Sequence, residues 1–248
     1  MKISVITATY NSCSTVRDAI ESVLSQTWPD VEYIVIDGGS RDGTVDILNE
    51  YRHRFAYFIS EPDKGIYDAL NKGIRAATGD VIGFLHSDDL FENTEVLATI
   101  ARTFAERDVD AVYGDLLYVS SNDPNRTLRY WRSGEFKPNS LLRGWMPPHP
   151  TFYVKRSLYE AAGLFDTSFR ISADYESVLR FVGKHGAKLA YIDQVLVRMR
   201  LGGASNRSLA NIVRKSREDL RAQQINGIGG LYTLVLKNLC KLPQFLRK

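Results

Sequence analysis

The sequence predicts an α/β fold in which one mostly parallel sheet is flanked by helices, with a helical extension at the C-terminus. Three observations predict it. In the first half, short apolar runs alternate with segments whose apolar residues recur at helical spacing. Polar residues and glycines come directly after each apolar run, at the edge where a parallel sheet gathers its ligands. Two further helical segments close the chain.

Four strands and four helices are expected before residue 110. The strands are short runs rich in Val, Ile and Phe, bounded by turn residues, at 3–6, 31–36, 55–59 and 81–85. The helices carry apolar residues at helical spacing, at 15–26, 42–51, 65–77 and 94–105. At the start of the first helix, Thr15 and Asp18 resemble a capping box with Asp in place of Glu. The alternation predicts crossover connections and therefore parallel strands.

The alternation ends after residue 115, where short aromatic-rich strands succeed one another. Strands are expected at residues 116–119, 128–131, 151–154, 189–192 and 195–199. Helices are expected at 155–162, from 172 onward, at 209–224 and at 231–242. We therefore divide the chain near residues 115 and 205, into parts 1–115, 116–205 and 206–248.

The composition is that of an ordinary globular protein of 248 residues with a net charge of +3, but the charge is unevenly spread. Residues 207–248 carry nine Lys/Arg and two acidic residues, whereas the rest of the chain carries 23 and 27. A basic tail suggests an anionic partner. Cys13 and Cys240 form no metal-ligand or disulfide pattern, and neither a signal peptide nor a membrane span is expected. These features favour a cytoplasmic protein, soluble or bound to a membrane surface.

Asp88 and Asp89 come directly after the apolar run 81–85 and the residues His86 and Ser87. Two adjacent carboxylates at the carboxyl end of a buried strand repel each other unless a cation or hydrogen-bond donors lie close by. Such oxygen ligands suit Mg²⁺ or Mn²⁺, which commonly combines one or two carboxylates with substrate phosphates. The pair therefore predicts a metal-held nucleoside diphosphate. Alternatively, one of the two aspartates caps a helix that begins after it.

Three other strand ends carry suggestive residues, namely 7–11, 37–40 and 61–68. In a parallel sheet these ends converge on one edge. The small residues after the first strand allow backbone amides to approach a base or a phosphate. Asp37 could accept hydrogen bonds from a base or a ribose, or it could simply form a turn before Gly38.

This ordered set of motifs resembles family 2 glycosyltransferases with the GT-A fold. The matching segments are residues 4–11, 25–27, 35–44, 63–73, 87–89 and 173–176. The resemblance covers roughly residues 1–205. It implies a nucleotide-sugar-binding half at 1–115, an acceptor-binding half of the same domain at 116–205, and a basic helical extension at 206–248.

The resemblance also implies a role for each matching residue. Asp89 would hold Mg²⁺ or Mn²⁺ and Asp174 would be the general base, with inversion at the anomeric carbon. The nucleotide and donor sugar would be bound by Thr7, Ala8, Thr9, Tyr10, Asn11, Asp37, Asp68, Lys72, Ser87, Asp88 and Arg200. The acceptor would be bound by His149, Tyr175 and Glu176. The chemistry fits, because a base that removes the acceptor proton typically contributes about 10²–10⁴-fold and a divalent ion stabilises the leaving diphosphate.

Several of these residues have a structural alternative. Asp174 could be an ordinary acidic residue in the first turn of a helix. Asp68 and Lys72, one helical turn apart, could pair with each other. Arg200, beside Gly202 and Gly203, could bind the diphosphate from a mobile lid or could be a solvated turn residue.

Two positions depart from the family pattern. Gly38 stands where a second acidic residue is frequent, which leaves the choice of nucleotide open. His86 stands where Asp or Asn is frequent, and it could support the metal site or pack at the strand end. A UDP-sugar is favoured from the family alone.

The segment 229–248 has two interpretations. A helical face of Leu231, Leu234, Val235, Leu239 and Leu242, with Lys237 and Lys241 off it, could contact a membrane surface or pack on the core. Many relatives act on polyprenyl-diphosphate-linked sugars, so we expect a glycan acceptor of that kind at the cytoplasmic face of the inner membrane, in bacterial polysaccharide synthesis.

Other functions are disfavoured by the residues that come after the first strand. A sugar-phosphate nucleotidyltransferase would have a Gly- and Arg-rich loop there, and a dinucleotide-dependent oxidoreductase would have G-x-G-x-x-G. A catalytically inactive nucleotide-sugar-binding subunit of a synthase stays an alternative. The basic tail is accompanied by no nucleic-acid-binding motif, so no nucleic acid is expected as a partner.

Overall fold

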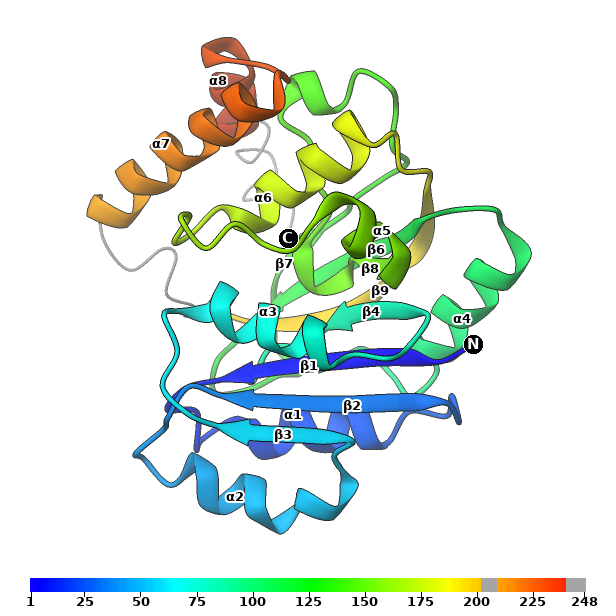
Figure 1. Ribbon diagram of the computed structural model, residues 1–248, viewed down its shortest axis with the longest axis vertical. Coiled ribbons are helices and arrows are strands. Elements are labelled where there is room, and N and C mark those ends of the chain that lie inside the picture. The colour runs from blue at the N-terminus through cyan, green and yellow to red at the C-terminus, as the bar shows by residue number, and fades with distance from the viewer. Residues whose placement is uncertain (202–208, 240–248) are drawn as a thin grey trace.

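The computed structural model describes residues 1–201 and 209–239 as one mixed sheet covered by helices (Figure 1). The strands are β1 (Ile3–Thr9), β2 (Val31–Asp37), β3 (Tyr57–Ser60), β4 (Val81–Phe84), β5 (Asp89–Phe91), β6 (Ala111–Val119), β7 (Thr127–Trp131), β8 (Tyr153–Lys155) and β9 (Leu189–Arg200). The helices are α1 (Val16–Leu24), α2 (Thr44–Glu50), α3 (Ile66–Ala76), α4 (Val96–Glu106), α5 (Arg156–Ala162), α6 (Ala173–Val178), α7 (Leu209–Asn226) and α8 (Leu231–Leu239). Shorter turns are η1 (Arg52–Arg54), η2 (Leu141–Arg143), η3 (His149–Thr151) and the π-helical η4 (Leu179–Lys184).

The strand order is β3-β2-β1-β4-β8-β6-β9-β5, with β7 paired to β6. The first four strands of this order are mutually parallel, as the alternation of strands and helices predicts. β8 is antiparallel to both of its neighbours, so β6 again runs in the direction of β4 and pairs in parallel with β9. The prediction of a mostly parallel sheet flanked by helices is therefore confirmed.

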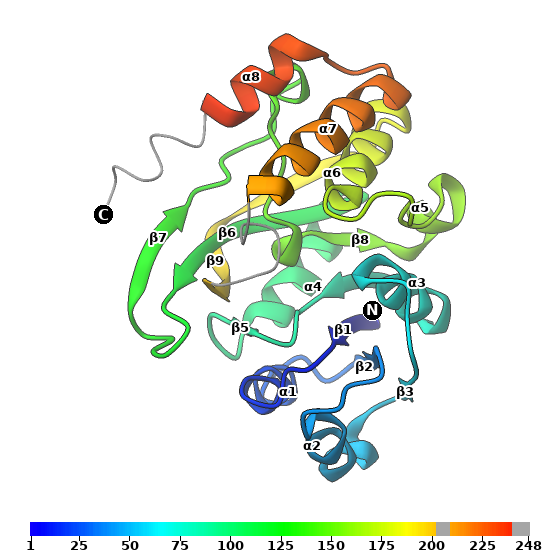
Figure 2. The same cartoon turned by 90° about the vertical axis from the view of Figure 1, so that its left-hand side faces the viewer.

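Side chains alternate between the two faces of the sheet, as the pleat of a β-strand requires. On one face, Ile6 and Phe84 pack in a core with residues of α3, α5 and α6. On the other face, Val5 and Val35 pack with residues of α1, α2 and α4. Helices α7 and α8 lie at the end of the molecule farthest from α2 (Figure 2). None of the helices within 1–201 and 209–239 is long and apolar enough to cross a membrane.

The structure differs from the sequence prediction in three places. A single long β9 replaces two expected strands, because bulges in its pairing with β6 absorb the polar residues between them. The expected capping box is wrong: Thr15 makes no side-chain cap, and Asp18 instead accepts a hydrogen bond from Arg200. Strand β5 was not expected, and it pairs antiparallel with the end of β9.

The structure bears differently on the two boundaries that we expect near residues 115 and 205. Residue 115 lies inside β6, so the sheet continues across it, and the division into nucleotide and acceptor halves stays a prediction. Residue 205 lies outside the described residues, as do the last three positions of the helix expected at 231–242.

Candidate active site

The carboxyl ends of β1, β2 and β4 lie side by side. Thr9 pairs with Asp37 across β1 and β2, and Ile6 pairs with Phe84 across β1 and β4. The loop after β1 also contacts the turn after β4 through a 2.9 Å hydrogen bond between the hydroxyls of Ser12 and Ser87. The structure therefore gathers three of the predicted motifs at one edge of the sheet.

Asp89 is the most unusual group at this edge. Its side chain is 0% exposed, and neither carboxylate oxygen has a hydrogen-bond partner among the described residues. Burial raises the pKa of Asp89 well above its usual range, and the adjacent charge of Asp88 raises it further, while the backbone and the charge of Arg200 oppose the shift. Asp89 begins β5, and no helix begins there, so it does not cap one. A buried carboxylate without partners is costly unless a cation compensates it.

The surroundings of Asp89 fit a cation that also binds phosphates. No group of three or more His, Cys, Asp or Glu side chains able to hold a metal occurs in residues 1–201 and 209–239. The described side chains at this edge therefore do not form a complete set of metal ligands by themselves. Mg²⁺ and Mn²⁺ need few protein ligands when substrate phosphates and water complete their shell. Asp89 is the residue that would hold such an ion.

Arg200, the last residue of β9, lies against both aspartates of the motif and against α1. Its guanidinium donates hydrogen bonds to the Asp18 carboxylate at 2.5 Å and to the backbone oxygen of Asp88 at 3.2 Å. The residue is 5% exposed, so it is not the solvated turn residue of the alternative. Its contact with a diphosphate stays a prediction. Gly202 and Gly203, the expected hinge of a lid, lie outside the described residues.

The hydroxyl of Thr7 makes its contacts within the protein. The residue is 0% exposed, and its hydroxyl donates to the backbone oxygen of Leu85 at 2.7 Å and lies 3.1 Å from the Tyr33 hydroxyl. The hydroxyl therefore ties β1 to the end of β4. The side chain has no exposed surface, and its contact with a nucleoside stays a prediction.

The carboxylate of Asp37 also makes its hydrogen bonds within the protein. It accepts hydrogen bonds from the amides of Gly39 and Ser40, from the Ser40 hydroxyl and from the Ser60 hydroxyl, at 2.5–3.0 Å. The residue is 0% exposed. These contacts favour the alternative, a turn-forming aspartate, and a contact with a base or ribose stays a prediction.

The loop after β1 is the open part of the donor side. Thr9 is 3% exposed with no partner for its hydroxyl in the described chain, whereas the side chain of Tyr10 is largely exposed. Asn11 adopts a left-handed backbone conformation (φ 49°) and accepts a hydrogen bond from the amide of Arg41 at 2.9 Å. Nucleotide contacts from Ala8, Thr9, Tyr10 and Asn11 stay predictions.

Lys72 and Asp68 contact other residues more closely than each other. The Lys72 ammonium lies 2.7 Å from a Glu61 oxygen and 4.0 Å from Asp68. The Asp68 carboxylate accepts a hydrogen bond from the amide of Lys64 at 3.1 Å. The two side chains therefore pair only loosely with each other, and nucleotide binding by either stays a prediction.

Asp174 occupies the first turn of α6, where Tyr67 contacts it. The Tyr67 hydroxyl donates to the backbone oxygen of Ile171 at 2.7 Å and lies 3.2 Å from a carboxylate oxygen of Asp174. Burial raises the pKa of Tyr67, and the charge of Asp174 raises it further, so the phenol stays protonated. Sequence reasoning missed Tyr67, although it lies within the matched segment 63–73, one residue before Asp68.

Two stacked histidines, His86 and His149, lie within the electrostatic range of Asp174. The rings of His86 and His149 stack with centroids 5.8 Å apart, and His149 also stacks on Phe84 at 5.1 Å. Burial lowers the pKa of His86, and it lowers that of His149 to about 4; the nearby charge of Asp174 opposes both shifts. Both rings are therefore neutral near pH 7. The stacking favours packing for His86, and acceptor binding by His149 stays a prediction.

Tyr175 and Glu176 are buried and bonded within the protein, and their contacts with an acceptor stay predictions. Tyr175 is 1% exposed, and its hydroxyl accepts a hydrogen bond from Gln223 at 3.2 Å. Glu176 is 3% exposed and forms an ion pair with Arg180 at 3.0 Å. On a helix, Asp174 points to a different face from its two neighbours, so the motif places one residue at the site and two in the core.

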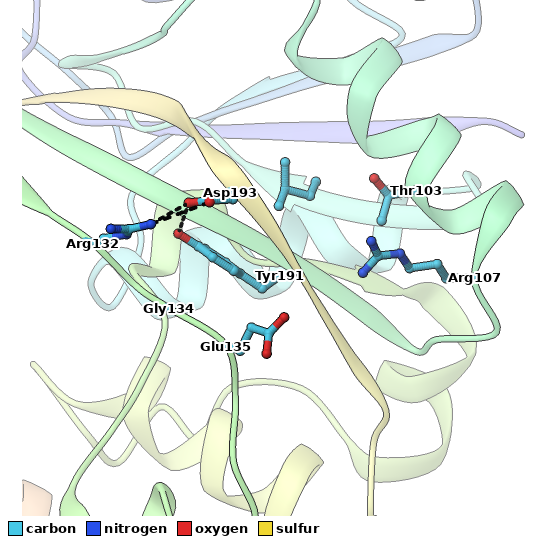
Figure 3. Close-up of a pocket in the computed structure, with 8 residues that line it drawn as sticks. Thr103, Arg107, Arg132, Gly134, Glu135, Tyr191 and Asp193 are labelled. Atoms are coloured by element: carbon cyan, nitrogen blue, oxygen red, sulfur yellow. Dashed lines mark hydrogen bonds and ion pairs between the residues drawn. The ribbon is translucent and has the colours of Figure 1, made fainter.

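A polar surface pocket of about 560 Å³ lies elsewhere, between the C-terminal end of α4, the loop after β7 and the middle of β9 (Figure 3). It is lined by Thr103, Arg107, Arg132, Gly134, Glu135, Tyr191, Ile192 and Asp193. Tyr191 precedes Arg200 by nine residues of β9, which corresponds to roughly 30 Å of extended strand. The pocket contains none of the predicted site residues.

Comparisons with known proteins show the family and the fold of the chain. A family model described as Glycosyl transferase family 2 matches residues 4–171. A PGL/p-HBAD biosynthesis glycosyltransferase of Mycobacterium bovis is 29% identical over 208 residues, which cover 82% of this chain and 78% of the relative. An uncharacterized glycosyltransferase of Mycobacterium tuberculosis is 36% identical over 183 residues, covering 72% and 68%.

Solved structures share the fold at low sequence identity. TarS of S. aureus in complex with UDP-GlcNAc has a TM-score of 0.69 at 19% identity, covering 91% of this chain and 65% of that one. The chain spans 43% of the longer TarS structure. The mannosyltransferase PcManGT of Pyrobaculum calidifontis, in complex with GDP-Man and Mn²⁺, has a TM-score of 0.64 at 19% identity, covering 100% and 76%. With two-thirds of its length matched by the family model, the chain belongs to glycosyl transferase family 2.

Proposed function

We propose that this glycosyltransferase is metal-dependent and inverting, and that it transfers a sugar from a UDP-sugar to a hydroxyl of a polyprenyl-diphosphate-linked glycan. Its place would be the cytoplasmic face of the inner membrane, in bacterial polysaccharide synthesis. One observation carries the proposal: Asp89 is a fully buried carboxylate without partners among the described residues, at the sheet edge beside Asp88. Asp174 lies close enough to this edge for its charge to act on His86.

The chain's own residues divide the reaction between them. Asp89 would hold Mg²⁺ or Mn²⁺, which when bound supplies positive charge to the leaving diphosphate. Asp174 would accept the proton of the acceptor hydroxyl while that oxygen forms its bond to the anomeric carbon and the bond to the diphosphate oxygen breaks. Attack from the face opposite the diphosphate inverts the anomeric carbon. Tyr67, 3.2 Å from Asp174, would hold the carboxylate in place.

The choice of UDP draws on the relatives and on the sequence. The TarS structure holds UDP-GlcNAc and the PcManGT structure holds GDP-Man, so the shared fold accommodates either base. Asp37, the residue expected to recognise the base, is occupied by its own turn. Base recognition would then fall to the open loop after β1, where the Tyr10 ring is 64% exposed and available for stacking.

Calorimetric titration of UDP and of GDP into the full chain, with Mn²⁺ and with a chelator, tests the proposal. Wild type should bind UDP only in the presence of Mn²⁺, and Asp89→Ala should lose that binding. Asp46→Ala, which changes an exposed aspartate of α2, is the matched control and should bind as wild type does. Binding that ignores both the metal and Asp89 would overturn the metal role. Binding of GDP alone would overturn the choice of donor.

A further inference from the structure

Helix α8 presents its residues in the reverse of the usual order. Its buried side chains are the polar Thr233 and Lys237, at 3% and 2% exposure. Its most exposed side chains are Leu231, Tyr232 and Val235, at 69%, 76% and 54%. A surface helix ordinarily turns its apolar face to the core and its polar face to water. Exposing this apolar face to water is unfavourable, which suggests that another molecule covers it.

The polar face of α8 is fixed to the protein by specific contacts. The Thr233 hydroxyl donates to the backbone oxygen of Leu142 in η2 at 2.8 Å. The Lys237 ammonium lies 2.9 Å from an oxygen of Asp219 in α7 and 3.0 Å from the ring centroid of Tyr175 in α6. Burial lowers the pKa of Lys237 to about 8, against the opposing effect of Asp219. Because these contacts set the rotation of the helix, the apolar side chains are held outward.

The exposed apolar residues form a small patch with cations beside it. We define the α8 patch as Leu231, Tyr232, Val235 and the adjoining Leu142, which is 49% exposed. Arg143 comes directly after Leu142 and is exposed without an ion pair in the described chain. Lys184, also exposed, reaches the carboxyl end of α7 through the backbone oxygen of Ile225 at 3.5 Å.

The two acidic residues of α7 are turned inward, whereas the half-exposed Asp166 beside α7 lies 3.9 Å from Arg221. The Glu218 carboxylate accepts hydrogen bonds from the amides of Ile171 and Ser172, and Asp219 is 2% exposed in its pair with Lys237. The exposed charges of α7 are Arg214, Arg217 and Arg221. The outward charge of α7 and of the region around the α8 patch is therefore positive.

We propose that the α8 patch docks on an anionic lipid bilayer. An interfacial helix binds through its apolar face together with attraction of nearby cations to anionic headgroups, and both are present here. A second copy of the chain fits less well: nine helical residues offer a face of about 130 Å², whereas a stable dimer buries about 800 Å² per partner.

Docking in this orientation would deliver a lipid-linked acceptor to the active site; this consequence, unlike the docking itself, rests on the proposed function. Lys237 lies over the ring of Tyr175, the residue next to Asp174. The outward face of α8 is thus about one helix diameter, roughly 10 Å, from the helix that carries the base. An acceptor sugar on a polyprenyl diphosphate would have only a short distance to span.

Co-flotation of the full chain with vesicles tests the docking. Wild type should float with phosphatidylcholine vesicles that contain phosphatidylglycerol, and much less with phosphatidylcholine alone. Leu231→Glu/Val235→Glu should lower the bound fraction at least about tenfold, because both charges would enter the headgroup region. Leu142→Glu, outside the helix, should act in the same direction. Tyr57→Glu, which changes an exposed side chain of β3, should float as wild type does.

Three results would overturn the docking. The first is that wild type does not bind anionic vesicles. The second is that the Leu142→Glu variant and the Leu231→Glu/Val235→Glu variant both bind them as well as wild type does. The third is that light scattering shows a dimer of wild type that the double substitution dissociates. UDP titration without vesicles should be the same for wild type and these variants. If a variant loses vesicle binding but still binds UDP, the result supports a role of the patch in docking. If wild type does not bind UDP, the result contradicts the proposed function and leaves the docking untouched.

Discussion

The turn after β2 and the turn after β4 begin alike and differ in what they leave free. Each brings an aspartate that is 0% exposed to the carboxyl edge of the sheet, Asp37 in one and Asp89 in the other. Asp37 accepts four hydrogen bonds from its turn and from β3. Neither oxygen of Asp89 has a partner in the described part of the chain. Position in the fold thus does not separate a structural aspartate from a ligand-binding one, but the use of its oxygens does.

The largest expected effect comes from removing the charge that lacks partners. Asp89→Asn should lower turnover of the UDP-sugar by at least about 10³-fold, since a bound cation supplies several kcal/mol to the transition state. In chelator, the same change should leave the thermal midpoint nearly unchanged, because burial already favours the protonated form of Asp89 when no cation is bound. Turnover assays measure the effect on activity, and thermal unfolding measures the effect on stability. A lower midpoint with unchanged turnover would make Asp89 a structural residue like Asp37.

Asp174 lies between Asp37 and Asp89 in the number of its hydrogen-bond partners, because its carboxylate has one 3.2 Å contact, from Tyr67. Asp174→Asn should lower turnover by about 10²–10⁴-fold, while the affinity for UDP and Mn²⁺ stays the same. Asp166→Asn, at a half-exposed carboxylate earlier in the chain, is the control and should turn over as wild type does. Full turnover by Asp174→Asn would remove the base role.

Asp37 should behave in the opposite way to Asp89. Asp37→Asn should lower the free energy of unfolding by about 2–4 kcal/mol, because several charge-assisted hydrogen bonds to a buried group are weakened or lost. The folded variant should bind UDP with wild-type affinity. Asp46→Asn should change the unfolding free energy by no more than about 0.5 kcal/mol. Weakened UDP binding with unchanged stability would restore a ligand role to Asp37.

Glu32, at the opposite edge of the sheet, extends the comparison to pH. Burial alone would raise its pKa, but hydrogen bonds from Lys2, Ser4 and Thr78 lower it to about 2. Since the unfolded chain binds the proton more tightly, the stabilisation is present above about pH 4.5 and is lost as the pH falls towards 2.

Denaturant unfolding between pH 6 and pH 3 measures this effect. Wild type should lose about 1–2 kcal/mol more than Glu32→Gln does over that range, a value reduced for partial solvent screening. Equal losses in the two proteins would mean that the hydrogen bonds of Glu32 do not favour its charged form.

The sequence predicts the first half of the fold well, because β1 to β4 and α1 to α4 each have an apolar pattern of their own. Strand β5 has none: Asp89, Leu90 and Phe91 are three residues whose strand conformation depends on pairing with β9. Long-range pairing of this kind leaves no local signal. The same reason explains the failed capping box, since Asp18 contacts a residue 182 positions away.

Asp88 and Asp174 are 86 positions apart in the sequence, yet the fold brings both charges close enough to act on His86; their roles stay predictions. The residues adjoining them were predicted less well. Tyr175 and Glu176 belong to the matched motif, yet helical geometry turns them into the core. Tyr67 was missed because a Tyr in an apolar helix face is an ordinary core residue until its hydroxyl is seen to contact Asp174.

The pairing of β5 with β9 has a consequence for how the chain is made. Asp89 pairs with Met199, which is 110 residues later in the sequence. At a synthesis rate of about 5–20 residues per second, β5 would wait roughly 5–20 seconds for its partner strand. A chain that ends before β9 would contain every matched motif of the first half and still lack the strand that pairs with Asp89. Release of a nearly full-length product is thus a condition for the enzyme's activity.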